Sequence, residues 1–272
     1  MNPLIAVCFF TGMLHFAEAS SSCLRLAGIR TGRVATSISF VNASLLVSRM
    51  SNMLQAPFLG GMVDTAIYLG NSASLVSSFR LIIFAAFIGN LVALILAPSS
   101  VQIFTKAITK FKVNPSVPRL ILSLLIPRNF IAFLKCFRLP RLRSLQGISL
   151  KGIPKTFLVL NILVASIYAI GVLAALMAGA LVPEYRVTAV QLSAIINGMA
   201  TILFTLMVDP GAAHITDQAA KGERPENDVR TVVFYLLAGR VVGTLVISQL
   251  LFMPGAEYIK TVTLLVKDAF LR

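Results

Sequence analysis

The chain has 272 residues, of which 57% are hydrophobic and only 12% are charged, and its mean hydropathy is +0.87. A soluble domain carries roughly 25% charged residues, so this composition excludes an ordinary soluble protein. A net charge of +14 would suggest a nucleic-acid partner in a soluble chain. Here the basic residues cluster beside apolar segments, without zinc-finger spacing or an aromatic RNA-binding motif. The composition indicates an integral membrane protein with no nucleic-acid partner.

Six apolar stretches are long enough to cross the membrane as helices, which takes about 20 residues for a hydrocarbon core of about 30 Å. They are Leu4–Leu24, Val34–Pro57, Leu81–Phe104, Phe157–Val182, Val187–Asp209 and Thr231–Phe252. The sequence therefore predicts an all-α, polytopic membrane protein of about six transmembrane helices. Residues 1–272 are expected to form a single transmembrane domain.

Lys and Arg are distributed unevenly between the two sides of this arrangement. Of the 24 such residues, 17 lie in the first, third and fifth loops, and five lie in the remaining loops and the C-terminal segment. Because cytoplasmic loops carry an excess of Lys and Arg, the pattern predicts a bacterial cytoplasmic membrane protein with both termini outside. Ala17-Glu18-Ala19 is similar to a signal-peptide cleavage site, but the basic residues follow the apolar run instead of preceding it. We therefore expect the first span to be retained.

A long basic loop, residues 105–156, separates the third and fourth spans and contains no acidic residue. Its short apolar runs, Leu120–Ile126 and Phe130–Phe137, are flanked by basic residues, as is typical of helices in the membrane interface. We expect this cytoplasmic loop to lie on the inner surface and contact anionic membrane lipids. A re-entrant pair within 117–145 and a loop that only sets topology are the alternatives.

Ionisable side chains inside a span cost a few kcal/mol each on insertion scales, so those present here are informative. His15, Glu18 and Arg25 are spaced to share one face of the first helix. A purely structural alternative is that His15 and Glu18 hydrogen-bond each other between packed helices.

The second span places an arginine deep in the membrane. Arg49 lies about 15 residues from the cytoplasmic end, or about 22 Å along a helix, which is too far for an easy return to the surface. Asn52 and Gln55 follow it closely. Pro57, with two glycines after it, is expected to break the helix just before Asp64. The structural alternative is that Arg49 pairs with one acid and serves packing alone.

The last two spans carry further polar groups. A stripe that recurs every four residues includes Asn197 and reaches Asp209, where Pro210 is expected to end the fifth helix. The sixth span holds Arg240 near mid-membrane, beside a GxxxG pair that allows close helix approach. The arginines thus lie at successive depths across the membrane. We expect them to turn inward and line a hydrophilic passage that is open to lipid. Such a passage could bind a phosphate, because arginine donates paired hydrogen bonds to phosphate oxygens.

Eight segments of the chain resemble the Amj family of bacterial lipid II flippases, the alternate to MurJ. The segments are HFAE (15–18), RLAGIRTGR (25–33), SRMSNMLQAPFLGGMVD (48–64), VPRLI (117–121), IYAIGVLAALMAGALVPEYR (167–186), QLSAIINGMATILFTLMVDP (191–210), ITDQAAKGERPENDV (215–229) and LAGRVVGTLVISQLLF (237–252). They cover most of the chain outside 65–115. The resemblance implies movement of lipid II, an undecaprenyl-diphosphate disaccharide-pentapeptide, from the inner to the outer leaflet.

The leading hypothesis combines lipid II transport, which the resemblance implies, with the positions of the charged and polar residues inside the spans. Arg25, Arg30, Arg49 and Arg240 would hold the diphosphate, Asn52, Gln55 and Asn197 would meet sugar or peptide groups, and His15, Glu18, Asp64 and Asp209 would balance or couple charge. An ion-coupled exporter of a small anion could use the same charges. A third possibility is a membrane enzyme acting on polyprenyl diphosphate, with Glu18 and His15 as acid and base. The sequence contains no hydrolase signature, so we expect a transporter and not an enzyme. It also contains no metal or cofactor motif, so we expect no cofactor.

Overall fold

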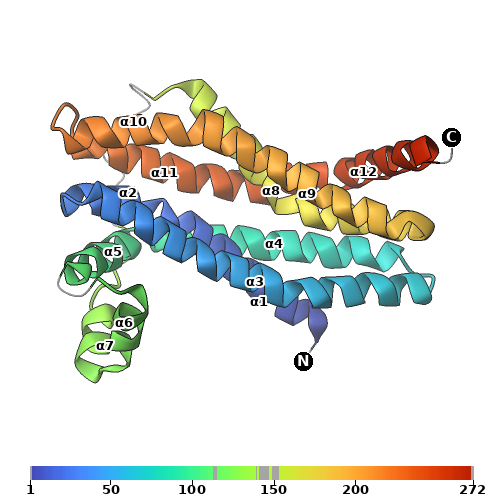
Figure 1. Ribbon diagram of the computed structural model, residues 1–272, viewed down its shortest axis with the longest axis horizontal. Helices are drawn as coiled ribbons and strands as arrows, with labels where there is room; N and C mark the ends of the chain where they lie inside the picture. Colours follow the sequence, from blue (N-terminus) through green and yellow to red (C-terminus); the bar gives the residue numbers. More distant parts are fainter. Residues whose placement is uncertain (1, 113–114, 139, 141–146, 149–152, 271–272) are drawn as a thin grey trace.

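The computed structural model describes every residue except 1, 113–114, 139, 141–146, 149–152 and 271–272. The long helices run roughly along one axis of the molecule (Figure 1). They are α1 (Pro3–Ser21) with α2 (Cys23–Arg30), α3 (Val34–Tyr68), α4 (Ala73–Ile95), α8 (Lys155–Leu181), α9 (Arg186–Leu203) with α10 (Asp209–Ala220), and α11 (Glu226–Val242) with α12 (Ser248–Phe270). The prediction of an all-α polytopic membrane protein is confirmed.

Five helical segments of the described chain are long and apolar enough to cross a membrane: Pro3–Arg30, Ala73–Ile95, Lys155–Leu181, Pro183–Ala220 and Glu226–Phe270. The predicted second span lies in α3, which is not among them and which carries Arg49 and Asp64. At 35 residues, α3 is about 52 Å long, well over the thickness of the hydrocarbon core. α3 packs along α1, which is part of the first of these five segments, and α3 has the length to cross the membrane beside it.

Two predicted helix ends are wrong. α3 continues through Pro57, Gly60 and Gly61 to Tyr68, since a helix packed among neighbours tolerates the backbone group that a proline leaves without a partner. The fifth helix also continues past Asp209-Pro210, through a π-helical turn at Phe204–Val208 and into α10. Pro210 stands in the first turn of α10, where a missing N–H costs little.

The predicted third span, Leu81–Phe104, is also wrong in its bounds. α4 ends at Ile95, and a separate helix, α5 (Ala97–Phe111), begins after Leu96. Pro98 explains this break, because a proline has no N–H to donate to the carbonyl four residues earlier, that of Leu94, and its ring clashes with that carbonyl. The first span, in contrast, extends beyond its predicted end, so that Arg25 and Arg30 lie on α2 and not in a loop.

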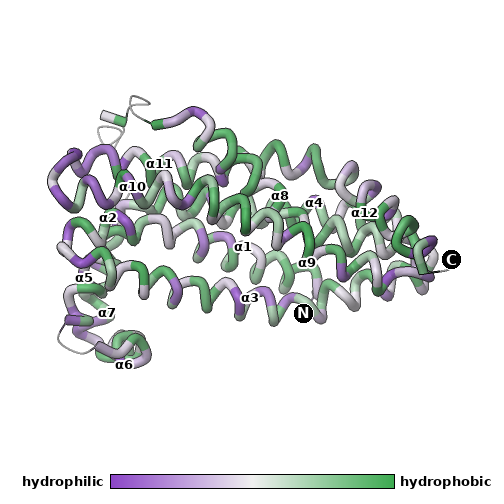
Figure 2. The backbone as a smooth tube through the Cα atoms, turned by 45° about the horizontal axis from the view of Figure 1, so that its top comes forward, coloured by the Kyte–Doolittle hydropathy of each residue, from purple (hydrophilic) through white to green (hydrophobic). Residues whose placement is uncertain are grey.

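The two ends of the bundle hold different segments of the chain, and hydrophilic residues occur at both ends (Figures 1 and 2). One end, called the basic end below, holds α2, α5 and the turn between α10 and α11. The opposite end holds the α3–α4 turn, the α8–α9 connection and the C-terminus. Gly32 after α2 and Gly70 after α3 have φ of +63° and +64°, so each reverses the chain in a conformation that other residues adopt at a cost.

The helices pack as two groups. α1 packs most extensively against α3 and α4, and α8 packs most extensively against α9 and α12, while α11 contacts both α4 and α8. One apolar core joins α4, α8 and α12, where Phe79 and Phe252 meet edge to face at 6.0 Å between ring centroids. α1–α4 thus form an N-terminal group, and α8–α12 form a C-terminal group.

The basic loop is partly described. Beyond α5 it forms α6 (Val117–Leu122), a 3-10 turn and α7 (Pro127–Leu134), which project beside the basic end (Figure 1). None of the α7 residues is buried, and Phe130, Ile131 and Leu134 are exposed. The expected interfacial position stays a prediction. The loop cations Arg141, Arg143 and Lys151 lie outside the described residues.

Candidate functional site

A small polar cavity lies where the two helix groups meet. Its volume is about 60 Å³, enough for a few water molecules, since one needs about 10–15 Å³ measured in this way. The walls come from α1, α3, α4, α8 and α9. Its polar lining residues are Thr11, His15, Asn52, Gln55, Tyr168 and Asn197.

Four predicted site residues, His15, Asn52, Gln55 and Asn197, therefore share one cavity. Thr11 Oγ1 donates to Gln55 Oε1 at 2.7 Å, and Gln55 Nε2 donates to Asn52 Oδ1 at 3.1 Å. These contacts fix the amides of α3 against α1. The cavity wall on this side is thus an ordered row of donors and acceptors.

Two buried atoms on the cavity wall lack a hydrogen-bond partner among the described residues. They are His15 Nδ1 and Asn197 Oδ1. A buried polar atom left without a partner costs roughly 1–3 kcal/mol, so the cavity favours water or a polar ligand group at these positions. No hydrogen bond joins His15 to Glu18 among the described contacts, which argues against the purely structural alternative for that pair.

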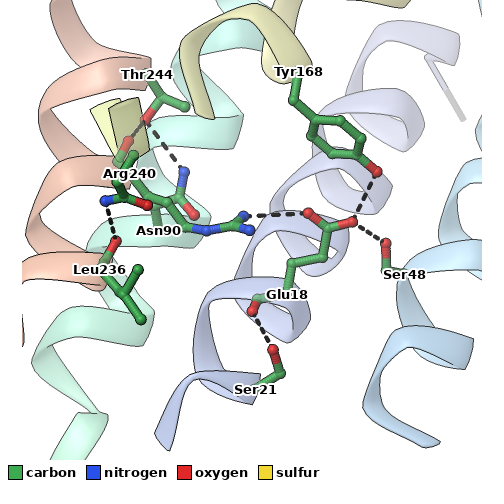
Figure 3. A network of polar contacts seen from close by, with 9 residues as sticks. Glu18, Ser21, Ser48, Asn90, Tyr168, Leu236, Arg240 and Thr244 are labelled. Atoms are coloured by element: carbon green, nitrogen blue, oxygen red, sulfur yellow. Dashed lines mark hydrogen bonds and ion pairs between the residues drawn. The ribbon is translucent and has the colours of Figure 1, made fainter. Parts of the chain in front are cut away.

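Glu18 and Arg240 form an ion pair that adjoins the cavity through Tyr168 (Figure 3). Arg240 Nη1 lies 3.2 Å from Glu18 Oε2, and the side chains are only 16% and 8% exposed. Ser48 and Tyr168 donate hydroxyl hydrogen bonds to the other carboxylate oxygen, at 2.7 and 2.9 Å. A protein tolerates buried charges only when an opposite charge and hydrogen bonds compensate them, and Arg240, Ser48 and Tyr168 do so for Glu18.

Arg240 is positioned by close packing of α11 on α8. A Cβ on Gly239 would come within 2.2 Å of Asn161 Nδ2, and one on Gly243 within 2.7 Å of Ser166 Oγ. Only glycine therefore permits this approach at both places. The predicted role of the GxxxG pair in close helix packing is confirmed.

Arg49 differs from the other predicted arginines. It is exposed, and it makes no ion pair or side-chain hydrogen bond with the residues that the structure describes. The expectation that Arg49 turns inward to line the passage is wrong, because its position on α3 faces away from the α1 packing surface held by Ser48, Ser51 and Gln55. Asn52, one helical turn from Arg49 on α3, lines the cavity. Arg49 thus lies beside the cavity without lining it.

The remaining predicted charges lie away from the cavity. At the basic end, Arg25 pairs with Asp209, and Arg30 Nη2 lies 2.7 Å from Glu226 Oε1. Asp64 pairs with Arg186 at 2.5 Å, on helices α3 and α9. Each pair joins the N-terminal group to the C-terminal group, as the Glu18–Arg240 pair does.

Sequence reasoning missed several of these partners. Thr11 could have been found, because it precedes His15 by four residues and Glu18 by seven, on the same helical face. Tyr168 lies in a long apolar run, and Arg186 and Glu226 lie near helix ends, where charge is ordinary. Nothing in the local pattern of these three residues signals their partners.

Among the described residues, no three His, Cys, Asp or Glu side chains gather closely enough to hold a metal ion. The site consists of amides, hydroxyls, one histidine, one buried ion pair and one unpaired arginine. This arrangement can bind polar and anionic groups.

Comparison with known proteins identifies the family. The model of the family described as "Amj: Alternate to MurJ" matches residues 10–263. The chain is 38% identical over 261 residues to a Bacillus subtilis (strain 168) protein named lipid II flippase Amj, with 96% of each chain covered. No solved structure matches the chain. The protein is a multi-pass membrane protein that belongs to the Amj family.

Proposed function

We propose that this protein is a flippase that moves lipid II from the inner to the outer leaflet of the bacterial cytoplasmic membrane. The name of its Bacillus subtilis relative supports this substrate. The single observation that carries the proposal is Arg49, an exposed cation midway along α3 that has no carboxylate partner among the described residues and lies one turn from Asn52 of the polar cavity.

An unpaired arginine at this depth is costly unless it meets water or an anion. The other three predicted arginines already have carboxylate partners, so Arg49 is free to receive a phosphate through its paired donors. Because Arg49 faces outward, a lipid diphosphate could reach it from the side while its prenyl tail stays in the bilayer. Asn52, Gln55 and Asn197 would then hydrogen-bond sugar or peptide groups.

Arg25 and Arg30 would meet the diphosphate only after leaving Asp209 and Glu226. They would therefore act at the basic end, during entry. His15 and Glu18 adjoin the cavity and are the groups best placed to couple charge or protons to transport, while Asp64 and Asp209 would do so through their arginine partners. We propose a transporter and no catalytic step.

The distribution of charge supports one orientation in the membrane. We propose that the basic end faces the cytoplasm, where α6 and α7 would lie on anionic lipid headgroups, and that both termini lie outside. Exposed Phe130 and Leu134 on α7, with basic residues around them, support an interfacial position.

A small anion exported with a coupled ion is a second candidate. The cavity volume of about 60 Å³ favours it, since a disaccharide would require the cavity to open. Transport of a small soluble anion would not explain why Arg49 faces outward from α3, toward the bilayer. Transport of a water-soluble anion by purified protein in vesicles, with no movement of lipid II, would establish this candidate instead.

Complementation tests the proposal. The chain is expressed in a bacterium depleted of its own lipid II flippases, and labelled precursor is measured at the outer face. We expect the unmodified chain and Arg80→Ala to restore it, since Arg80 bonds only Gln249 among the described residues. Arg49→Ala should insert normally but fail. Wall synthesis supported by Arg49→Ala would refute the assigned role of Arg49.

A further inference from the structure

Glu18 is held by donors from three different helices. Ser48 on α3 and Tyr168 on α8 both donate to Oε1, at 2.7 and 2.9 Å, whereas Arg240 on α11 donates to Oε2 at 3.2 Å. The arginine contact is the longest of the three and uses the other oxygen (Figure 3). The carboxylate would therefore keep two hydroxyl donors if Arg240 moved away.

Arg240 has spare capacity for an anion. A guanidinium carries five N–H donors, and the contact to Glu18 is the only side-chain hydrogen bond of Arg240 among the described residues. Its side chain is 16% exposed, against 8% for Glu18. A phosphate group can accept two parallel hydrogen bonds from a guanidinium, which a single contact to one carboxylate oxygen does not match.

We infer that Glu18 is a resident counter-anion for Arg240, which a phosphate of the lipid substrate replaces during transport. This inference rests on the proposed function and assigns a positioning role to Glu18, Ser48 and Tyr168. In the substrate-free protein Glu18 neutralises Arg240. When the phosphate arrives, it pairs with Arg240, and the Glu18 carboxylate keeps the hydrogen bonds from Ser48 and Tyr168, which reduce the cost of its burial.

The exchange also explains release. A site that only attracted the diphosphate would hold it, whereas transport requires binding weak enough for the ligand to leave. The return of Glu18 to Arg240 supplies a competitor within the protein, and it ejects the phosphate without a change in net charge at the arginine. Removing the competitor should strengthen binding and slow transport.

Glu18→Gln tests the exchange, because the amide keeps an acceptor for Ser48 and Tyr168 but loses the charge. Purified full-length protein in phosphatidylcholine nanodiscs is titrated with undecaprenyl diphosphate, and bound lipid is measured by native mass spectrometry. We expect Glu18→Gln to bind on the order of tenfold more tightly than the unmodified protein and to move lipid II more slowly. Glu257→Gln, the same change at an exposed pair on α12, should leave affinity unchanged.

Loss of the Glu18 charge could strengthen binding either by freeing Arg240 or simply by making the site more positive, and the Arg240→Gln background distinguishes these two causes. Glu18→Gln should not strengthen binding there, because the arginine it competes for is gone. Unchanged or weaker binding by a folded Glu18→Gln protein, or a gain that persists without Arg240, would overturn the inference.

Tyr168→Phe keeps the test decisive if Glu18→Gln does not fold. With one hydroxyl donor lost, Glu18 depends more on Arg240, so undecaprenyl diphosphate should bind several-fold more weakly. In the Arg240→Gln background the same substitution should have no further effect. Unchanged or tighter binding by Tyr168→Phe, or further weakening without Arg240, contradicts the exchange.

Undecaprenol, which lacks phosphate, distinguishes this inference from the proposed function. If the unmodified protein binds undecaprenyl diphosphate no better than undecaprenol, the proposed function itself fails. If it prefers the diphosphate and loses that preference in Arg49→Ala, while Glu18→Gln binds as the unmodified protein does, only the counter-anion role fails.

Discussion

At the scale of single residues, burial decides what each ion pair is worth. Glu18 and Arg240 are mostly buried, whereas Asp64 and Arg186 are 59% and 40% exposed. Breaking a buried pair leaves a charge without compensation, but an exposed pair exchanges its partner for water. The first pair should therefore contribute to stability, and the second should be easy to open.

Arg240→Gln should lower the free energy of unfolding by about 3 kcal/mol, the low end for a broken buried pair, because Ser48 and Tyr168 still bond Glu18. Arg186→Gln should lower it by less than about 1 kcal/mol. A thiol-reactive dye can report unfolding, since Cys23 and Cys136 are free and buried. Equal losses in the two variants would show that burial does not separate the pairs.

The sequence predicted which polar residues lie close together better than it predicted their partners. His15, Asn52, Gln55 and Asn197 were selected from helical spacing, and they line one cavity. Periodicity assigns a face within one helix, but it does not say which other helix covers that face. The Tyr168–Glu18 contact joins residues 150 positions apart, so tertiary packing alone determines it.

At the scale of helices, proline and glycine act through their surroundings. Pro57 and Pro210 were expected to end helices and do not, because neighbouring helices and a first-turn position remove most of the cost. The hydropathy of the sequence located the apolar helices approximately, since the length and apolarity of a segment are local properties. It could not predict where each helix ends, because the ends depend on packing against other helices.

Glycine substitutions test this account of the helices. Gly239→Ala should destabilise the protein by about 1–3 kcal/mol, because the new methyl group would overlap Asn161 of α8. Gly198→Ala is the matched control on α9, where nothing lies within 4 Å of the added carbon; it should be neutral or stabilise by up to about 1 kcal/mol. Thermal unfolding with the thiol-reactive dye measures both, and a stable Gly239→Ala protein would contradict the close approach of α11 to α8.

At the scale of the whole molecule, the described residues form four ion pairs that join the N-terminal group of helices to the C-terminal group. Two lie at the basic end, one is buried beside the cavity, and Asp64–Arg186 joins α3 to α9. The exposed pairs are weak enough to break in turn, whereas the buried pair needs a replacement anion. This division fits a transporter whose cavity opens toward one end at a time.

Asp64→Asn should open the end of the cavity that faces outside in the proposed orientation, because it removes the exposed ion pair that joins α3 to α9. In a protein whose native cysteines are replaced, a cysteine at position 197 should react several-fold faster with a membrane-impermeant maleimide added outside cells. Exchanging the charges with Asp64→Arg and Arg186→Asp should return the rate to that of the parent. An unchanged rate in Asp64→Asn would show that this pair does not close the cavity.

The most direct test of the central claim is the rate at which purified protein moves lipid II across the bilayer of reconstituted vesicles. The account predicts rapid movement with the unmodified protein and with Arg80→Gln, and none above protein-free vesicles with a folded Arg49→Gln protein. Undiminished movement with Arg49→Gln would contradict the claim that an unpaired arginine beside the cavity carries the diphosphate.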